Sequence, residues 1–442
     1  MKRSNRYYIL LFALAIIFLF GSCLSSSVQN YSSDAAVTAF GISNDSVPAM
    51  ATTIFTIDNA TKTIYNVDSL PYHTKTLKAI PAVTANSTSG IQFNDTTYQS
   101  GDTINFDKPV TMTNYAADGT TSITYTITVN VHKIDPDSVQ WKKKTYPALT
   151  GTITDEKALW FNGQAMLFIN NGSNITLYTS TDGTAWTSHA TSGIPVNTSV
   201  QQMTGFGAML YLIQSGNSLL KSPDGITWTP YSANISNNFT TLIGVMASNL
   251  WAVVQTGSSY AFAISTDAVN WTVGSQIPAD FPVSGFTAVS YLPLSGSPKM
   301  TVIGGTSTGG VLLNAIYSGS SYDNSWSNFA TETTPAAFPP RLGASVAWYD
   351  SKLLLMGGAT ATGMVQDTML WSRSGGLFWT KSDSLTRIPP SLYFQPRQNA
   401  SLFIDDSYRI WLIGGKNSYG NYMRDVWMGR KNLLGFGQTN TL

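Results

Sequence analysis

The chain has 442 residues, of which 43% are hydrophobic and only 11% are charged, and its formal net charge is +1. This length suits two or three domains, and with no basic block beyond Lys142–Lys144 the composition excludes the electrostatic footprint of nucleic-acid binding. Its one cysteine, Cys23, excludes an internal disulfide and a thiolate metal site. Abundant Ser, Thr, Asn, Gly and aromatic residues favour an exported, all-β protein.

Residues 1–22 have the layout of a lipoprotein signal peptide. Basic residues precede an apolar run, Tyr7 to Phe20, which is shorter than the roughly 20 residues that span a bilayer. The segment FGSC, ending at Cys23, resembles the bacterial lipobox, which implies that Cys23 is acylated and anchors the protein stably in a membrane. An uncleaved anchor and an ordinary signal peptide remain alternatives.

The residues after Cys23 form a Ser-rich flexible tether, residues 23–34, without an acidic cluster. The layout resembles that of Bacteroidota-type envelope lipoproteins. This resemblance implies the outer membrane as the location and leaves the choice between its periplasmic face and the cell surface open.

Residues 35–134 alternate apolar and polar side chains in short runs such as TTIFTID, VTMTNY and SITYTITVNVHKI. Alternation with turn residues between the runs predicts half-buried strands of a β-sandwich. The segment from Ser100 to Val129 resembles the end of the Ig-like modules found near the anchors of such lipoproteins.

Residues 135–432 contain repeats. The phrases STDGTAWT, SPDGITWT and STDAVNWT place Trp186, Trp228 and Trp271 at intervals of 42 and 43 residues. A strand-turn-strand phrase at such a period predicts a β-propeller.

The repeated phrase resembles the Asp box of sialidase-like propellers. We expect it to brace a turn, because Ser and Asp bond to turn backbone, Gly allows positive φ and Trp buries a large face. Three equally spaced copies also argue against catalysis. The residues of this group are Ser180, Asp182, Gly183, Trp186, Ser222, Asp224, Gly225, Trp228, Ser265, Asp267 and Trp271.

Later repeats, with FPPRLGASVAWY and FQPRQNASLFID, resemble kelch repeats. An arginine opens the inner strand, a glycine pair follows the second strand, and an aromatic residue comes later, with Trp427 expected to correspond to Trp371. The structural residues of this group are Arg341, Gly357, Gly358, Trp371, Trp379, Arg397, Gly414, Gly415 and Trp427.

Six such repeats are present, and the last lacks a fourth strand. The segment around Trp141 has the pattern of a fourth strand without a repeat before it. We therefore expect a six-bladed propeller closed by this N-terminal strand, with seven blades as the alternative, followed by a tail, residues 433–442.

The chemistry available is sparse. Three scattered histidines suggest no metal site, and no cofactor-binding pattern is present. The Arg387-Ile388-Pro389 tripeptide aligns with other links between repeats, so a sialidase-like glycoside hydrolase remains an alternative rather than the leading function.

We expect the propeller to bind a glycan or a protein ligand at the cell envelope without catalysis, as a monomer, with a structural scaffold as a further alternative. Loops between second and third strands and links between blades should open on one face. Aromatic and basic candidates for ligand binding there are Tyr260, Arg387, Tyr393, Phe394, Lys416, Tyr419, Tyr422 and Arg424.

Overall fold

The computed structural model describes residues 30–133, 135, 138–330, 339–367 and 369–432. The predicted signal peptide, Cys23, most of the tether and the tail lie outside these residues. The chain divides into two compact units, Met1–Asp135 and Pro136–Leu442. Apart from the helix α2 (Pro48–Ala51) and the 3-10 turn η1 (Pro390–Leu392), the described secondary structure consists of strands, which confirms the all-β class.

From residue 30 onward, where the structure describes it, the first unit contains two sheets. The smaller pairs β1 (Val37–Ser43) with β4 (Ile80–Ala85). The larger has the order β2 (Phe55–Asp58), β3 (Thr63–Asn66), β8 (Ser122–Thr128), β7 (Val110–Tyr115), β5 (Gly90–Phe93) and β6 (Thr96–Thr97). Only the β3 and β8 pairing is parallel among these strands.

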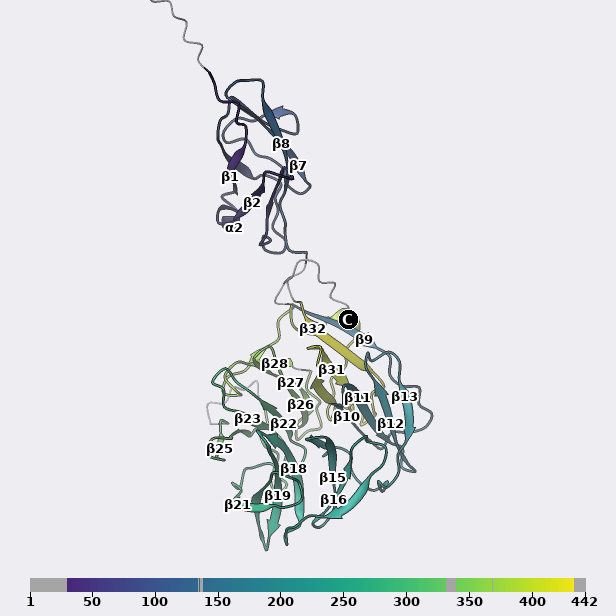
Figure 1. Ribbon diagram of the computed structural model, residues 1–442. Helices are drawn as coiled ribbons and strands as arrows, with labels where there is room; N and C mark the ends of the chain where they lie inside the picture. The colour runs from purple at the N-terminus through teal and green to yellow at the C-terminus, as the bar shows by residue number, and fades with distance from the viewer. Residues whose placement is uncertain (1–29, 134, 136–137, 331–338, 368, 433–442) are drawn as a thin grey trace, which may run out of the picture. The chain divides into compact units, whose positions relative to one another are not determined.

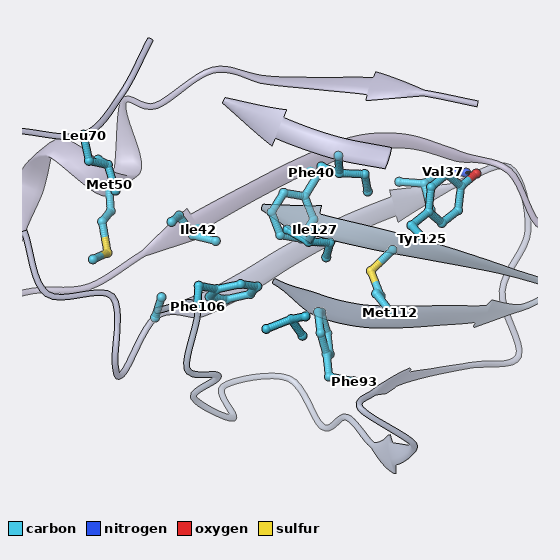
Figure 2. Packing of buried hydrophobic residues seen from close by; sticks show 13 residues of the cluster. Val37, Phe40, Ile42, Met50, Leu70, Phe93, Phe106, Met112, Tyr125 and Ile127 are labelled. Carbon is cyan, nitrogen blue, oxygen red and sulfur yellow. Dashed lines mark hydrogen bonds between the residues drawn. The ribbon is translucent and has the colours of Figure 1, made fainter. Parts of the chain in front are cut away.

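The core of the first unit is formed by the apolar positions of the alternating runs (Figure 2). In β8, Tyr125 and Ile127 are fully buried while Thr124 and Thr126 are exposed, as a period of two requires. The Tyr125 hydroxyl accepts a hydrogen bond from Val37 N at 3.0 Å, which ties β1 to the larger sheet. The predicted run extends to residue 134, but β8 ends at Thr128, and Asn130 N bonds instead to the Asn66 side chain at 2.6 Å.

The described residues of the second unit form six four-stranded antiparallel sheets, here numbered one to six (Figure 1). Sheet one contains β10 (Asp155–Phe161), β11 (Gln164–Asn170), β12 (Ile175–Ser180) and β13 (Thr187–Ala190). Sheet two contains β14 (Thr204–Phe206), β15 (Met209–Ser215), β16 (Ser218–Ser222) and β17 (Thr229–Ser232). Sheet three contains β18 (Phe239–Met246), β19 (Asn249–Thr256), β20 (Ser259–Ser265) and β21 (Thr272–Gln276).

The remaining three sheets follow the same order. Sheet four contains β22 (Thr287–Tyr291), β23 (Lys299–Ile303), β24 (Ile316–Ser320) and β25 (Trp326–Asn328). Sheet five contains β26 (Leu342–Tyr349), β27 (Lys352–Ala359), β28 (Met369–Ser372) and β29 (Thr380–Lys381). Sheet six contains β30 (Ser401–Ile404), β31 (Ile410–Ile413), β32 (Val426–Lys431) and β9 (Val139–Lys144).

Buried side chains fill the spaces between consecutive sheets. One apolar cluster joins each sheet to the next, and another joins sheet six to sheet one through Trp411 and Leu167. The first strands of neighbouring sheets, such as β10 and β30, lie next to one another. The six sheets therefore pack in a cycle, in which each sheet shares a buried apolar cluster with the sheet before it and with the sheet after it.

Strand β9 comes from the start of the unit and pairs with β32 near its end. The pairing is antiparallel from Val139 opposite Lys431 to Lys144 opposite Val426. Trp141 donates from Nε1 to the Thr386 carbonyl at 3.0 Å, so the strand is also held by the link from sheet five.

The expected correspondence of Trp427 with Trp371 is wrong by one position. Counting from the glycine pairs, Met356 pairs with Met369 and Ile413 pairs with Val426. Leu370 therefore takes the place of the fully buried Trp427, and Trp371 points to the other side of its sheet.

Candidate functional site

Hydrogen bonds within each turn close the Ser-x-Asp-Gly phrases. In sheet two, Ser222 Oγ accepts from Gly225 N at 2.8 Å, and Asp224 Oδ1 accepts from Ile226 N at 2.8 Å and Thr227 N at 3.0 Å. Asp182 and Asp267 accept the same pair of backbone bonds. The bond from Thr184 is the main cause that holds the pKa of Asp182 below its usual range. These carboxylates are therefore engaged by turn backbone.

The residue after each aspartate has positive φ and contacts a neighbouring sheet. Gly183 and Gly225 have φ of 68° and 75°, and Ala268 takes the position at 61° in the third turn. A Cβ on Gly225 would lie 2.8 Å from the Phe168 ring of sheet one. Trp228 and Trp271 are buried and donate to the carbonyls of Gly225 and Ala268. Trp186 instead reaches the Thr145 carbonyl at 2.8 Å, outside its own turn.

The glycine pairs join each of the later sheets to the next one. Gly305 N donates to the Arg341 carbonyl at 2.8 Å, and Gly358 N donates to the Arg397 carbonyl at 3.0 Å. The guanidinium group of each arginine donates instead to the glycine pair of the sheet that the arginine precedes: Arg341 donates to Gly357 O at 3.2 Å, and Arg397 donates to Gly414 O at 2.9 Å. Both arginines are almost fully buried, and burial lowers the pKa of Arg341 to about 10.

Arg397 also forms a buried ion pair. Its Nη1 lies 2.5 Å from Asp425 Oδ1, and its Nη2 lies 3.1 Å from Asp425 Oδ2. Trp427 Nε1 donates to the same carboxylate at 2.9 Å, and the Arg397 guanidinium stacks 4.4 Å from the centre of the Phe394 ring. Arg397 thus contacts both the joint between sheets five and six and the Phe394 ring, which lies on the link between the same two sheets.

At the joint from sheet six to sheet one, the second glycine of the pair donates to a side-chain carboxylate, whereas at the two earlier joints it donates to the carbonyl of an arginine. Glu156 Oε1 accepts from Gly415 N at 2.6 Å, and Glu156 Oε2 accepts from the Tyr146 hydroxyl at 2.8 Å. Glu156 is 2% exposed, and burial raises its pKa to about 7 although both hydrogen bonds lower it. Glu156 lines none of the three hollows described below, and its two hydrogen bonds join sheet one to sheet six and to the segment before β10.

The predicted ligand residues of the β31–β32 loop mostly hold neighbouring backbone. The Tyr422 hydroxyl donates to Thr154 O at 2.7 Å, and the Arg424 guanidinium donates to Leu149 O at 3.2 Å and to Gly151 O. The Lys416 ammonium lies 4.4 Å from the centre of the Tyr422 ring. Only Tyr419, which is 86% exposed, projects freely from this loop. Tyr260 lies apart from these residues, on β20, and packs against the core between sheets three and four.

Arg387 and Phe394 line a hollow of about 380 Å³, called here the smaller hollow, which lies between the outer strands of sheet five and the link that follows β29. Its lining residues are Asp367, Met369, Lys381, Ser382, Arg387, Ile388, Pro390, Phe394 and Pro396. Tyr393, next to Phe394, has a φ of 54° and a ring that is 86% exposed. The structure thus brings three of the predicted ligand residues together on one link.

A second hollow of about 710 Å³, the larger hollow, lies beside the same edge of sheet five. Its lining residues are Val139, Tyr349, Asp350, Lys352, Trp371, Arg373, Ser374, Phe378, Thr380, Lys381, Asp383, Leu385, Thr386 and Lys431. None of them was predicted as a ligand residue, although the aromatic and basic sequence from Trp371 to Lys381 was a usable indication. Strand β29 has only two residues whereas β9 has six, and this short edge leaves room for the hollow.

The aspartates of the larger hollow have partners. Asp350 Oδ2 lies 2.8 Å from Lys431 Nζ and 3.2 Å from Lys352 Nζ. Burial raises the pKa of Asp350, but the two lysines lower it further, so the group titrates below its usual range. Asp383 accepts from the Thr386 hydroxyl at 2.8 Å and from two backbone N–H groups, which lowers its pKa. Both carboxylates are therefore ionised at neutral pH.

A third hollow, of about 300 Å³, lies between sheets one and two. It is lined by His189 and Asp224, and His189 Nε2 lies 3.2 Å from Thr179 Oγ1. In the described part of the chain, no group of three or more His, Cys, Asp or Glu side chains could hold a metal ion. The hollows beside sheet five therefore offer the most varied binding chemistry.

Comparisons with known proteins identify the family. A family model described as "DUF6242 beta propeller domain" matches residues 135–439, and one described as "Domain of unknown function (DUF6242) N-terminal domain" matches residues 25–129. A solved structure entitled "Structure of YjhT" is 14% identical and covers 64% of this chain and 96% of that chain, with a TM-score of 0.48. No curated protein matches the sequence. The chain belongs to the DUF6242 family, a family of unknown function, and its second unit is a β-propeller domain.

Proposed function

We propose that the propeller binds a glycan, without catalysis, in the smaller hollow between sheet five and the link that follows β29. The observation that carries this proposal is that apolar side chains and the unpaired guanidinium group of Arg387 line the same hollow. Phe394 and two prolines supply the apolar wall, and the Arg387 guanidinium makes no hydrogen bond or ion pair with another described residue. Sugars offer apolar C–H faces to rings and hydroxyl oxygens to planar donors.

The exposed ring of Tyr393 supports the same proposal. A bulky residue at positive φ is a strained conformation that a fold keeps when something else requires it. Here the conformation ends the η1 turn, and the Tyr393 side chain is exposed on the link that also carries Arg387 and Phe394. Phe394 is itself fixed between the Arg397 guanidinium and Trp427, whose ring centre lies 5.4 Å away. The Phe394 ring is therefore held in place before any ligand binds.

The absence of a carboxylate pair favours binding over hydrolysis. Glycoside hydrolysis generally needs two carboxyl groups, one on each side of the scissile bond. Among the described residues that line the smaller hollow, Asp367 is the one carboxyl group. The aspartates of the larger hollow are held by lysines and by turn backbone, as described above.

A glycan array probed with the full-length protein tests this proposal. We expect selective binding to some glycans, and roughly tenfold weaker binding after Arg387→Ala or Tyr393→Ala. Lys142→Ala, at an exposed lysine of β9 outside both hollows, is the matched control. An array without binding, or equal binding by all variants, would sink the proposal and favour a protein partner or a scaffold role.

We also propose that Cys23 carries lipid and holds the protein at the outer membrane. The support is the sequence around Cys23 alone. Among the residues that the structure describes, no helix is long and apolar enough to cross a membrane. Metabolic labelling with a fatty-acid analogue should mark the wild-type protein and spare Cys23→Ala, and equal labelling of the two would refute the anchor.

We infer further that each four-stranded sheet is one blade, which gives a six-bladed propeller closed by β9, and that the first unit is Ig-like. The cyclic series of apolar clusters and the pairing of β9 with β32 support the blade count. The packed sheets of the first unit support the Ig-like assignment, although the parallel pairing of β3 with β8 gives its larger sheet a mixed topology. An experimental structure of the mature chain with a different number of blades would overturn the inference.

A further inference from the structure

The two hollows beside sheet five share one wall. Lys381 lines both, while Thr380 before it faces the larger hollow and Ser382 after it faces the smaller one. Trp371, in the larger hollow, donates from Nε1 to Ser382 Oγ at 2.7 Å. The hollows therefore follow each other along the outer edge of sheet five, and they meet at the Lys381 side chain.

The walls of the two hollows carry an excess of positive charge. Five cations line them, namely Lys352, Arg373, Lys381, Arg387 and Lys431, against the three carboxylates Asp350, Asp367 and Asp383. The excess of two positive charges on these walls exceeds the formal net charge of +1 for the whole chain. Positive charge is therefore concentrated at this edge of the propeller.

Three of the five cations have no partner that neutralises them. Lys352 and Lys431 are paired with Asp350. The side chains of Arg373, Lys381 and Arg387 make no hydrogen bond or ion pair with any other described residue. Arg373 lines the larger hollow, Lys381 lines both and Arg387 lines the smaller hollow, so each hollow has two of these free cations on its walls.

Apolar rings accompany these cations. Phe378 is 68% exposed at the wall of the larger hollow, where Trp371 also presents part of its ring. Phe394 lines the smaller hollow. Both hollows therefore combine cations with aromatic rings, and an oligosaccharide that carries anionic groups beside apolar sugar faces would match both kinds of side chain.

We propose that the two hollows form one elongated groove that binds an anionic oligosaccharide, with carboxylate or sulfate groups contacting Arg373, Lys381 and Arg387. This inference rests on the proposed glycan binding and adds the ligand's charge and its length. A ligand that fills only the smaller hollow contacts Arg387 and Lys381. A longer ligand also reaches Arg373 and Phe378.

Calorimetric titration of the full-length protein in detergent tests the groove. The probes are oligogalacturonates of two and six sugars, which carry carboxylates, a kappa-carrageenan hexasaccharide, which carries sulfates and no carboxylates, and neutral cellohexaose. We expect the anionic hexasaccharides to bind at least tenfold more tightly than cellohexaose and the anionic disaccharide, with an affinity that falls as salt rises. The stronger of the two anionic hexasaccharides identifies the preferred acidic group.

Variants separate the two hollows. Arg373→Ala should weaken binding of the preferred hexasaccharide roughly tenfold and leave the disaccharide unchanged, whereas Arg387→Ala should weaken both. Lys142→Ala should change neither. Because Arg373 and Arg387 make no side-chain bonds within the described structure, these variants should keep the wild-type unfolding midpoint in urea.

Three results would overturn the groove. Equal affinity for cellohexaose would show that the free cations do not select charge, and an unchanged hexasaccharide affinity of Arg373→Ala would remove the larger hollow from the site. Both results leave glycan binding at Arg387 intact. An equal loss on Lys142→Ala would show that the attraction is unspecific. Failure of every saccharide to bind would instead defeat the proposed function itself.

Discussion

Replacing Glu156 with glutamine is expected to stabilise the propeller at pH 8 and to change its stability little at pH 4.5. Glutamine keeps an oxygen that can accept the hydrogen bond from Gly415 N, and its amide group can bond to the Tyr146 hydroxyl. The substitution therefore removes the titration and preserves the joint between sheets six and one.

The sign follows from the direction of the pKa change. Burial raises the pKa of Glu156 from a usual value of 4.5 to about 7 in the folded protein. Between these pH values the folded state binds more protons than the unfolded chain, so the free energy of unfolding falls as the pH rises through this window. The difference corresponds to at most about 3 kcal/mol, since one pKa unit is worth about 1.4 kcal/mol.

Urea unfolding followed by tryptophan fluorescence measures this change in the stability of the propeller unit, Pro136–Leu442. All 12 tryptophans of the chain lie at Trp141 or later, so the signal reports the propeller alone. The unfolding free energy of Glu156→Gln minus that of wild type should rise between pH 4.5 and pH 7 and stay constant above. Glu156→Ala, which leaves Gly415 N without this acceptor, should be less stable than Glu156→Gln by about 1–3 kcal/mol at every pH.

The reasoning would be refuted by stability curves of wild type and Glu156→Gln that run parallel from pH 4.5 to pH 8. It would also be refuted by a difference that shrinks as the pH rises. Either result would mean that Glu156 is ionised in the folded protein without the cost that its burial implies.

Further substitutions test the joints and turns. Gly357→Ala would place a Cβ against the Arg397 carbonyl at a φ of 68°, so it should cost several kcal/mol, whereas Gly363→Ala, at a φ of 76° in open space, should cost about 1 kcal/mol in the same urea assay. Asp425→Asn should lower the unfolding free energy by about 3–5 kcal/mol because it leaves the buried positive charge of Arg397 without a carboxylate partner. A loss below about 1 kcal/mol would contradict the buried pair. Asp267→Asn should show the opposite pH dependence to Glu156→Gln, because hydrogen bonds lower the pKa of Asp267. The variant should be less stable than wild type at pH 7, and the difference should shrink as the pH falls below about 4. Unfolding midpoints of both proteins, measured from pH 7 down to acid pH, would check this.

Local sequence patterns predicted the features that depend on local geometry. The hydrogen bonds around Asp224 join residues two or three positions apart, and the glycine pairs meet a conformational requirement of their own backbone. Such features repeat with each sheet and can be recognised by their period. The pairing of β9 with β32 was also expected. The last repeat lacks a fourth strand, and the segment around Trp141, before the first repeat, has the pattern of a fourth strand.

Features that depend on distant contacts could not be predicted in this way. Glu156 bonds to a residue 259 positions away, and no repeated phrase marks it. Tyr422 and Arg424 had the residue types of ligand contacts, but the link that passes beside their loop supplies carbonyls that take up their donors. The larger hollow arises from the shortness of β29, which becomes evident only once the strand register is known.

Hydrogen–deuterium exchange of the full-length protein, with and without a saturating anionic hexasaccharide, tests the central claim most directly, because it locates bound ligand on the chain. The account predicts slower exchange in residues 369–396, which contain β28, β29 and the link with Arg387 and Phe394, and unchanged exchange around the Ser-x-Asp-Gly turns of sheets one to three. Slower exchange confined to residues 414–424, or no change anywhere at saturation, would contradict a binding site between sheet five and the link that follows β29.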